Sequence, residues 1–180
     1  MIPTTKLILA NVISFIPVGF GSLVSLKFIS ELINKKTQKI TLLFLLAFFT
    51  PLVSSEILKQ ICFKRFEGSE RPIGACGCDM LCLGADVSGA PGCPSGHMAS
   101  TTGVCLLFIL FLIKSPNLTK IYSLPKRISL ICINIIIIVL MGWARYHKKC
   151  HNMIQIFGGI ILGSIISPLI YSLNNKIKLI

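Results

Sequence analysis

Residues 128–144 of the chain read ISLICINIIIIVLMGWA, an uncharged and almost wholly apolar run between Arg127 and Arg145. A hydrocarbon core about 30 Å thick is crossed by about 20 apolar residues in a helix, so this run predicts a transmembrane helix that gains a turn from its flanks. Only helices and closed barrels satisfy their own backbone hydrogen bonds in lipid. This one stretch therefore indicates a helical membrane protein.

Four further apolar runs have the same character and occupy residues 7–26, 40–58, 98–113 and 153–173. The mean hydropathy of the 180-residue chain is +0.81, and only 13% of its residues are charged, against roughly 25% in a soluble domain. The first run is too long for a signal-peptide core and no typical cleavage site follows it, so we expect it to be retained. The sequence thus predicts one all-α domain, residues 1–180, built as a multi-pass transmembrane helical bundle of about five spans.

The net charge of +12 does not indicate a nucleic-acid partner, because the basic residues flank the apolar runs. Five spans place residues 59–94 and 145–152 on one side of the membrane. The opposite side carries a slight excess of Lys and Arg, and cytosolic loops attract such an excess. We therefore expect the long loop to lie on the non-cytosolic face, in the periplasm or the lumen of the endoplasmic reticulum.

This long loop, residues 59–94, is too polar to cross a membrane and is rich in glycine and cysteine. A loop of this length is usually functional. Together with Cys150, its cysteines make an even number on one face, which favours disulfides in an oxidising compartment. Free thiols remain an alternative, as does zinc. The candidate zinc ligands, whose spacing lacks the usual paired C-x2-C, are Cys76, Cys78, Cys82 and Cys93.

Three polar clusters fall on the same predicted face. They are Lys64-x6-Arg71-Pro72, Pro94-Ser95-Gly96-His97 and Arg145-x5-His151. Cations and a helix N-terminus bind phosphate oxygens, and two histidines can divide the roles of nucleophile and general acid. The clusters predict phosphoryl transfer in which protein cations stabilise the charge. No metal and no cofactor is expected.

The order and spacing of these motifs resemble those of the type 2 phosphatidic acid phosphatases, whose superfamily also contains the vanadium haloperoxidases. The resemblance covers about residues 64–155. It implies that His151 is the nucleophile, forming a phosphohistidine, and that His97 protonates the leaving oxygen. It also implies that the phosphate is bound by Lys64, Arg71, Ser95, Gly96 and Arg145. His147 does not fit the motif spacing and is expected to be a solvated loop residue.

Two positions depart from the family pattern. Ala144 stands where the family has Ser, and Gln155 stands where the family has the Asp that supports the nucleophilic histidine. A glutamine carbonyl can accept the hydrogen bond but cannot supply negative charge. The sequence alone therefore predicts that Gln155→Asp raises turnover, unless Asp79 or Asp86 reaches the site from the loop. The family core also has six helices, one more than the runs counted above.

The resemblance implies an integral membrane phosphatase that acts without metal on a lipid phosphate or an isoprenoid (polyprenyl) pyrophosphate. The expected partners are this substrate and the membrane. The alternative is a catalytically weak or inactive family member that binds lipid phosphates, with Gln155 as the mark of lost turnover.

Overall fold

The structure, a computed structural model, describes residues 5–33, 39–64, 66–78 and 86–177. Within these ranges the regular structure consists of helices and two isolated β-bridges, with no strand. The helices are α1 (Thr5–Ser14), α2 (Ile16–Ile33), α3 (Lys39–Ile61), α4 (Gly96–Lys114), α5 (Pro116–Ile121), α6 (Leu124–His147) and α7 (Met153–Ile177). The predicted all-α class is confirmed.

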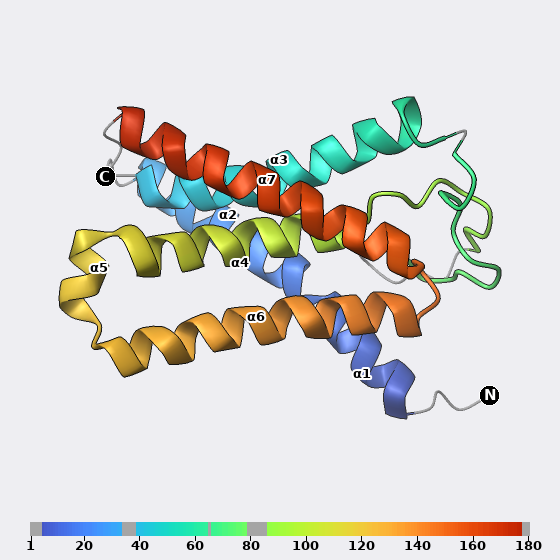
Figure 1. Cartoon of the computed structure of the whole chain (residues 1–180), viewed down its shortest axis with the longest axis horizontal. Helices are drawn as coiled ribbons and strands as arrows, with labels where there is room; N and C mark the ends of the chain where they lie inside the picture. Colours follow the sequence, from blue (N-terminus) through green and yellow to red (C-terminus); the bar gives the residue numbers. More distant parts are fainter. Residues whose placement is uncertain (1–4, 34–38, 65, 79–85, 178–180) are drawn as a thin grey trace.

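Five helical segments are long and apolar enough to cross a membrane, as the sequence predicted, so the chain is a multi-pass membrane protein. They are Ile8–Lys27, Ile40–Ile61, Gly96–Lys114, Leu124–His147 and Met153–Asn174. The two runs that were short in sequence lengthen at their flanks, since α4 begins at Gly96 and α6 extends from Leu124 to His147. Short α5 lies between them, at the end of the bundle opposite the long loop (Figure 1).

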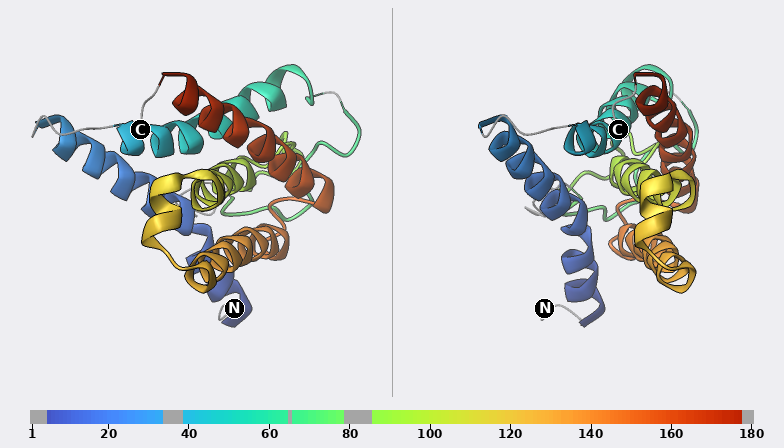
Figure 2. Two further views of the ribbon diagram at one scale, coloured as in Figure 1. Left: turned by 60° about the vertical axis from the view of Figure 1, so that its left-hand side comes forward. Right: turned by 90° about the vertical axis from the view of Figure 1, so that its left-hand side faces the viewer.

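The first span is broken at Phe15, between α1 and α2. Pro17 follows, and proline lacks the N–H that a continuous helix needs and clashes with the preceding turn. The Phe15 N–H instead bonds to the Val12 carbonyl at 3.1 Å, a tighter turn than the α-helical one. The two halves therefore run in different directions, as Figure 2 shows.

Helix α4 lies at the centre of the bundle, with α3 and α7 on one side of it and α6 on the other (Figure 1), and 78% of its most apolar window is buried. Small residues on α7 let the two backbones touch. A Cβ added at Gly159 would lie 2.5 Å from the Ser95 carbonyl oxygen, and one at Gly163 would lie 2.5 Å from that of Ala99. Close packing through small residues is a common means of helix association in lipid. Here it presses the start of α4 against the start of α7.

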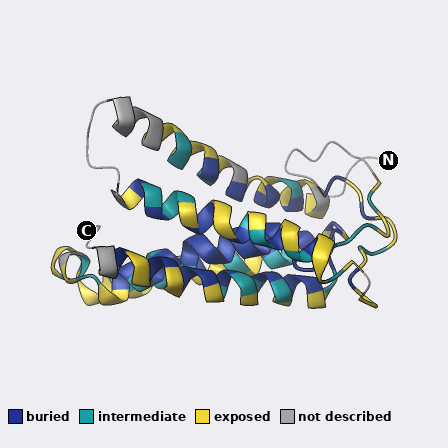
Figure 3. Cartoon of the chain, turned by 90° about the horizontal axis from the view of Figure 1, so that it is seen from above, coloured by how far each residue is buried: buried dark blue, intermediate teal, exposed yellow. Residues whose placement is uncertain are grey.

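The main apolar core surrounds α4 in the half of the bundle that carries α5 and includes Leu43, Phe48, Leu107, Phe111, Ile170 and Tyr171. Many other apolar side chains point outward, and Figure 3 shows exposed residues along the outer faces of the helices. On α6 only 11% of the span window is buried. Such faces suit a lipid environment, because lipid tails are as apolar as the side chains they meet.

The long loop folds back on itself rather than running free. The Arg71 N–H donates to the Ala90 carbonyl at 2.9 Å, and the Gly92 N–H donates to the Ser69 carbonyl at 2.7 Å. A β-bridge between Cys76 and Asp86 extends this pairing. The loop and residues 148–152 meet at one end of the bundle (Figure 1). Residues 79–85, which include Asp79 and Cys82, lie outside the described part of the chain.

Candidate active site

The start of α4 presents polar groups at this end of the bundle. Ser95 is the N-cap residue, its side chain makes no capping bond, and its Oγ is buried without a partner among the described residues. Gly96 follows, and a Cβ there would lie 2.8 Å from the Ser55 hydroxyl. Glycine is therefore needed for α4 to pack so closely on α3. The free N–H groups of the first turn form a site suited to an anion.

His151 is held by Gln155, one helical turn further along the chain. Its Nδ1 lies 3.0 Å from Gln155 Oε1, and both side chains are buried. The amide nitrogen of Gln155 donates to the Glu70 carbonyl at 2.7 Å, to the Ser69 carbonyl at 3.1 Å and to the Gly68 carbonyl at 3.4 Å. These bonds fix the orientation of the amide, so Oε1 is the atom that faces the imidazole.

This orientation determines the tautomer of His151. Since Gln155 Oε1 can only accept, Nδ1 must carry the proton, which leaves the Nε2 lone pair for a substrate. Burial, followed by the positive charges of Arg145 and Arg71, lowers the pKa of His151 well below its ordinary value of 6.5, while the Gln155 hydrogen bond opposes this shift. The imidazole is therefore neutral at neutral pH, the form in which it can act as a nucleophile.

Three cations surround the two histidines. The positive charges of Arg145, Lys59 and Arg71 all act on His97 and on His151, so these side chains share one electrostatic site. Nε and Nη1 of Arg71 are buried without a hydrogen-bond partner among the described residues, and so is Nε2 of His97. Buried donors of this kind normally have a partner. A tetrahedral oxyanion such as phosphate can accept from all of them.

Lys59 is a candidate site residue that the motifs in the sequence do not indicate. The apolar run ends at residue 58, but α3 continues to Ile61 and carries Lys59 on its buried face, where Nζ donates to Glu56. Lys64, which the motif spacing favoured, is exposed and makes no hydrogen bond or ion pair with any described residue. The helical spacing of Ser55, Glu56 and Lys59 at the end of an apolar run could have shown that these residues share a face.

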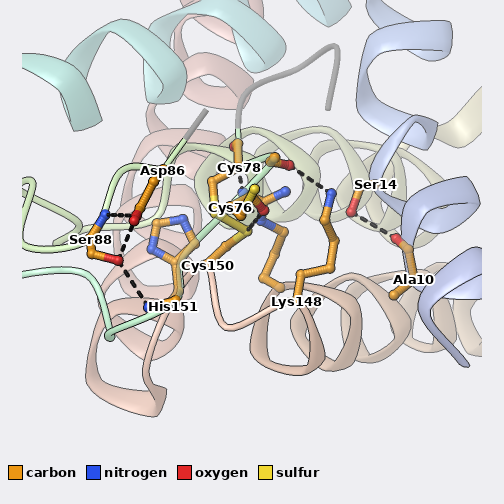
Figure 4. Close-up of a disulfide and its surroundings, with 12 residues drawn as sticks. Ala10, Ser14, Cys76, Cys78, Asp86, Ser88, Lys148, Cys150 and His151 are labelled. Carbon is orange, nitrogen blue, oxygen red and sulfur yellow. Dashed lines mark hydrogen bonds between the residues drawn. A yellow bond between two sulfur atoms is a disulfide. The ribbon is translucent and has the colours of Figure 1, made fainter. Parts of the chain in front are cut away.

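A disulfide between Cys78 and Cys150 links the long loop to the segment that carries His151, as Figure 4 shows. Two buried cations hold the same part of the loop: Arg145 Nη2 donates to the Cys78 carbonyl at 2.7 Å, and Lys148 Nζ donates to the Gly77 carbonyl at 2.8 Å. The disulfide removes Cys78 from any zinc site. Among the described residues, no three His, Cys, Asp or Glu side chains are grouped to bind a metal.

Replacing Cys150 by Ser is expected to destabilise the protein by about 2–5 kcal/mol, because the crosslink spans 72 residues and long loops lose most chain entropy on closure. Thermal unfolding in detergent measures the effect, and Cys132→Ser, at an exposed free thiol of α6, is the control. Equal unfolding temperatures for the two variants would contradict the pairing. A thiol count on protein extracted with thiols blocked also shows whether the bond forms in the cell.

The other polar residues singled out in sequence lie at the edge of this site. His147 is exposed as predicted, but it is the last residue of α6 rather than a loop residue, and its ring stacks on Trp143 at 5.0 Å. Asp86 is exposed, and hydrogen bonds from Ser88 lower its pKa. The charge that Gln155 lacks is therefore not supplied by Asp86. Ala144 is fully buried in the apolar packing of α6.

A mouth cavity of about 560 Å³ leads from the surface to His151. Its wall is formed by Pro72, Ile73, Tyr146, His147, Lys149 and Asn152. The cavity lies between the loop segment that follows Arg71 and the α6–α7 connection, and His151 is part of its lining. The site thus combines a neutral, oriented imidazole, several cations and a helix N-terminus at one end of a membrane-spanning bundle.

Residues 40–178 match a sequence model of the PAP2 superfamily, and this range contains all three motif clusters. The fold is similar to the crystal structure of a transmembrane PAP2-type phosphatidylglycerolphosphate phosphatase from Bacillus subtilis, with a TM-score of 0.70 and 24% sequence identity. That match covers 98% of this chain and 80% of the other. Among curated proteins, no significant match is found.

Proposed function

The chain belongs to the PAP2 superfamily, and on this premise we propose that it is a membrane phosphatase that hydrolyses a lipid phosphate through a phosphohistidine at His151. The observation that carries the proposal is the hydrogen bond between His151 and Gln155, because it leaves Nε2 unprotonated on a histidine that lines the mouth cavity. Few structural roles require a buried, neutral and oriented imidazole among several cations.

In the first step, Nε2 of His151 attacks phosphorus, and the bond between phosphorus and the lipid oxygen breaks. His97 takes up the proton that the bound phosphate monoanion carries and passes it to the leaving oxygen, so the lipid departs as a neutral alcohol. Arg71, Arg145 and Lys59 stabilise the negative charge on the phosphoryl oxygens, as preorganised cations do in other phosphoryl transfers. The imidazolium-like charge that forms on His151 is stabilised by the carbonyl of Gln155.

In the second step, water attacks the phosphorus of the phosphohistidine and the N–P bond breaks. His97 accepts the proton of this water and passes it to the departing phosphate, which returns the imidazole to its neutral starting state. His151 regains its lone pair at Nε2, and inorganic phosphate leaves through the mouth cavity. The protein cations provide all the charge stabilisation that the two steps need, so the proposed mechanism uses neither a metal nor a cofactor.

The position of the site favours a substrate whose tail stays in the bilayer, either a lipid phosphate monoester or a polyprenyl pyrophosphate. The Bacillus subtilis protein of similar fold is named as a phosphatidylglycerolphosphate phosphatase. This name supports a lipid phosphate as the class of substrate. We place the site on the non-cytosolic face. The Cys78–Cys150 disulfide supports this side, because such bonds persist in oxidising compartments.

Purified protein in detergent is expected to release phosphate from phosphatidic acid or from a polyprenyl pyrophosphate, and to do so at an unchanged rate in excess EDTA. The reason is that protein cations, rather than a divalent ion, stabilise the transferring phosphoryl group. The assay measures inorganic phosphate with and without chelator. Loss of activity in EDTA that magnesium restores would contradict the proposed mechanism.

A second prediction separates the two candidate lysines. Lys59→Met is expected to lower kcat/KM by about ten- to hundredfold, because the phosphate loses one hydrogen bond from a charged group. Lys64→Met is expected to change it by less than about threefold, because Lys64 is exposed. Methionine keeps the length of the stem, so folding is preserved, and Lys59→Arg, which retains the charge, should restore part of the activity. A larger loss of kcat/KM for Lys64→Met than for Lys59→Met would show that Lys64 binds the phosphate instead.

The second candidate function, a binding protein for lipid phosphates without turnover, is favoured by one observation, the neutral Gln155 beside the nucleophile. Such a protein binds a lipid phosphate at the same cations but forms no phosphoenzyme. The phosphate-release assay decides between the two functions, and binding to phosphatidic acid vesicles without release would establish the second.

A further inference from the structure

An apolar groove of about 330 Å³ lies between α6 and α7. The two helices diverge from residues 148–152, with α4 between them (Figure 1). Ile138, Val139, Gly142 and Trp143 line the groove from α6, and Met153 and Phe157 line it from α7. All of these are apolar, and Val139 and Phe157 are exposed on the outer surface of the bundle, so the groove is open along its length to lipid.

The groove continues the mouth cavity of His151. Tyr146 lines both, and one helical turn before it, Gly142 and Trp143 belong to the groove. On the opposite wall Asn152 lines the mouth cavity, and the next residue, Met153, lines the groove. A molecule that extends from His151 between these two walls therefore passes from a polar mouth into an apolar channel without a break.

The dimensions of the groove suit one leaflet of a bilayer. From Tyr146 to Ile138 the wall is eight residues long, about 12 Å at 1.5 Å per residue. Half of a hydrocarbon core about 30 Å thick is about 15 Å. A chain attached to a phosphate at His151 would therefore lie in the groove over most of the depth of its own leaflet.

We propose that the groove between α6 and α7 binds the acyl chain of the lipid phosphate whose headgroup is hydrolysed at His151. This inference rests on the proposed function, and it adds the route by which the lipid tail leaves the site. A larger apolar cavity of about 440 Å³ is lined by Lys27, Ile40 and Phe108. It shares no lining residue with the mouth cavity, so it does not offer the same continuity.

Gly142 keeps the groove open at its floor. A Cβ added there would lie 3.5 Å from Ile156 and 3.7 Å from Met98, which is ordinary contact. Alanine is therefore tolerated at this position, whereas the branched end of a leucine must extend into the groove. At the rim, Val139 is 64% exposed, so even a large side chain fits there without disturbing the packing of the bundle.

The test compares Val139→Trp with Ile136→Trp. Ile136 is 54% exposed on the same helix and does not line the groove, so it is a matched control. The two substrates are dioleoyl and dihexanoyl phosphatidic acid in detergent micelles. We expect Val139→Trp to lower kcat/KM for the long-chain lipid by about tenfold, since several methylene contacts are lost. For the short-chain lipid, kcat/KM should change by less than about twofold. Ile136→Trp should change neither.

Gly142→Leu, which fills the groove from its floor, should show the same selective loss, with Gly142→Ala close to the unmodified protein. Equal losses for both substrates, or no loss for the long-chain lipid, would overturn the proposal while leaving the proposed function intact. An altered oligomeric state of Val139→Trp with unchanged activity would instead assign the groove to a second copy of the chain. If the unmodified protein hydrolyses neither lipid, the proposed function itself fails.

Discussion

His151→Ala is expected to abolish turnover, with kcat falling by about 10⁴-fold or more, because no other group among the described residues offers an oriented, neutral imidazole to the substrate. The variant should also form no phosphoenzyme. Rapid acid-free quenching with radiolabelled substrate detects the intermediate in the unmodified protein, since phosphohistidine is labile in acid and stable in alkali. Near-normal turnover in this variant would show that the third motif has been assigned wrongly.

Two variants at the other histidines sharpen this result. His97→Ala should slow both formation and breakdown of the phosphoenzyme, because the same side chain protonates the leaving oxygen and later activates water. His147→Ala should cost a few-fold at most, since His147 is exposed and stacks on Trp143. The acid limb of the kcat/KM profile should lie below the ordinary histidine range, because burial and nearby cations lower the pKa of His151.

Gln155→Asp is expected to destabilise the protein and to lower turnover, contrary to the expectation from the sequence. A carboxylate cannot donate, so the Glu70 carbonyl loses its side-chain partner and the Ser69 carbonyl keeps only the Gly92 N–H; an unsatisfied polar group costs about 1–3 kcal/mol when it is buried. The new charge is also buried against these carbonyl dipoles. A loss of about 1–3 kcal/mol is a substantial part of a stability of roughly 5–15 kcal/mol.

Turnover falls because the same turn positions Arg71, which follows Glu70 directly. Gln155→Glu is the matched comparison, since it keeps the length of the side chain and changes only the donor. Both acidic variants should unfold at lower temperature and hydrolyse substrate more slowly. If the site lacked only negative charge, both would instead increase kcat, and that outcome would restore the family's usual role for an acid at this position.

The sequence by itself determined the membrane class and the five spans, and it predicted where the candidate site lies. Apolar length is a local property, so a run such as residues 128–144 specifies a spanning helix whatever its neighbours are. The motifs around His97, Arg145 and His151 lie next to span ends. Counting the spans therefore predicted that they share one face, and residues 40–178, which match the PAP2 superfamily, contain all of them.

Only the tertiary structure decided which groups meet in the site. Lys59 rather than Lys64 shares the electrostatic site with the histidines, because α3 runs beyond its apolar segment and turns Lys59 inward. Likewise, the pairing of Cys78 with Cys150 could not be chosen from spacing, since it joins residues 72 apart. Such contacts depend on how the loop folds back over the helix ends, which no local pattern records.

Gln155 shows most clearly which contacts the sequence alone does not reveal. In sequence it is a neutral substitute for an acid, because only its distance from His151 along one helix can be seen. In the structure its amide also holds the carbonyls of the turn before Arg71, more than 80 residues earlier in the chain. The contribution of a buried polar side chain to stability depends on all of its hydrogen-bond partners together. Those partners come together only when the loop and α7 have packed.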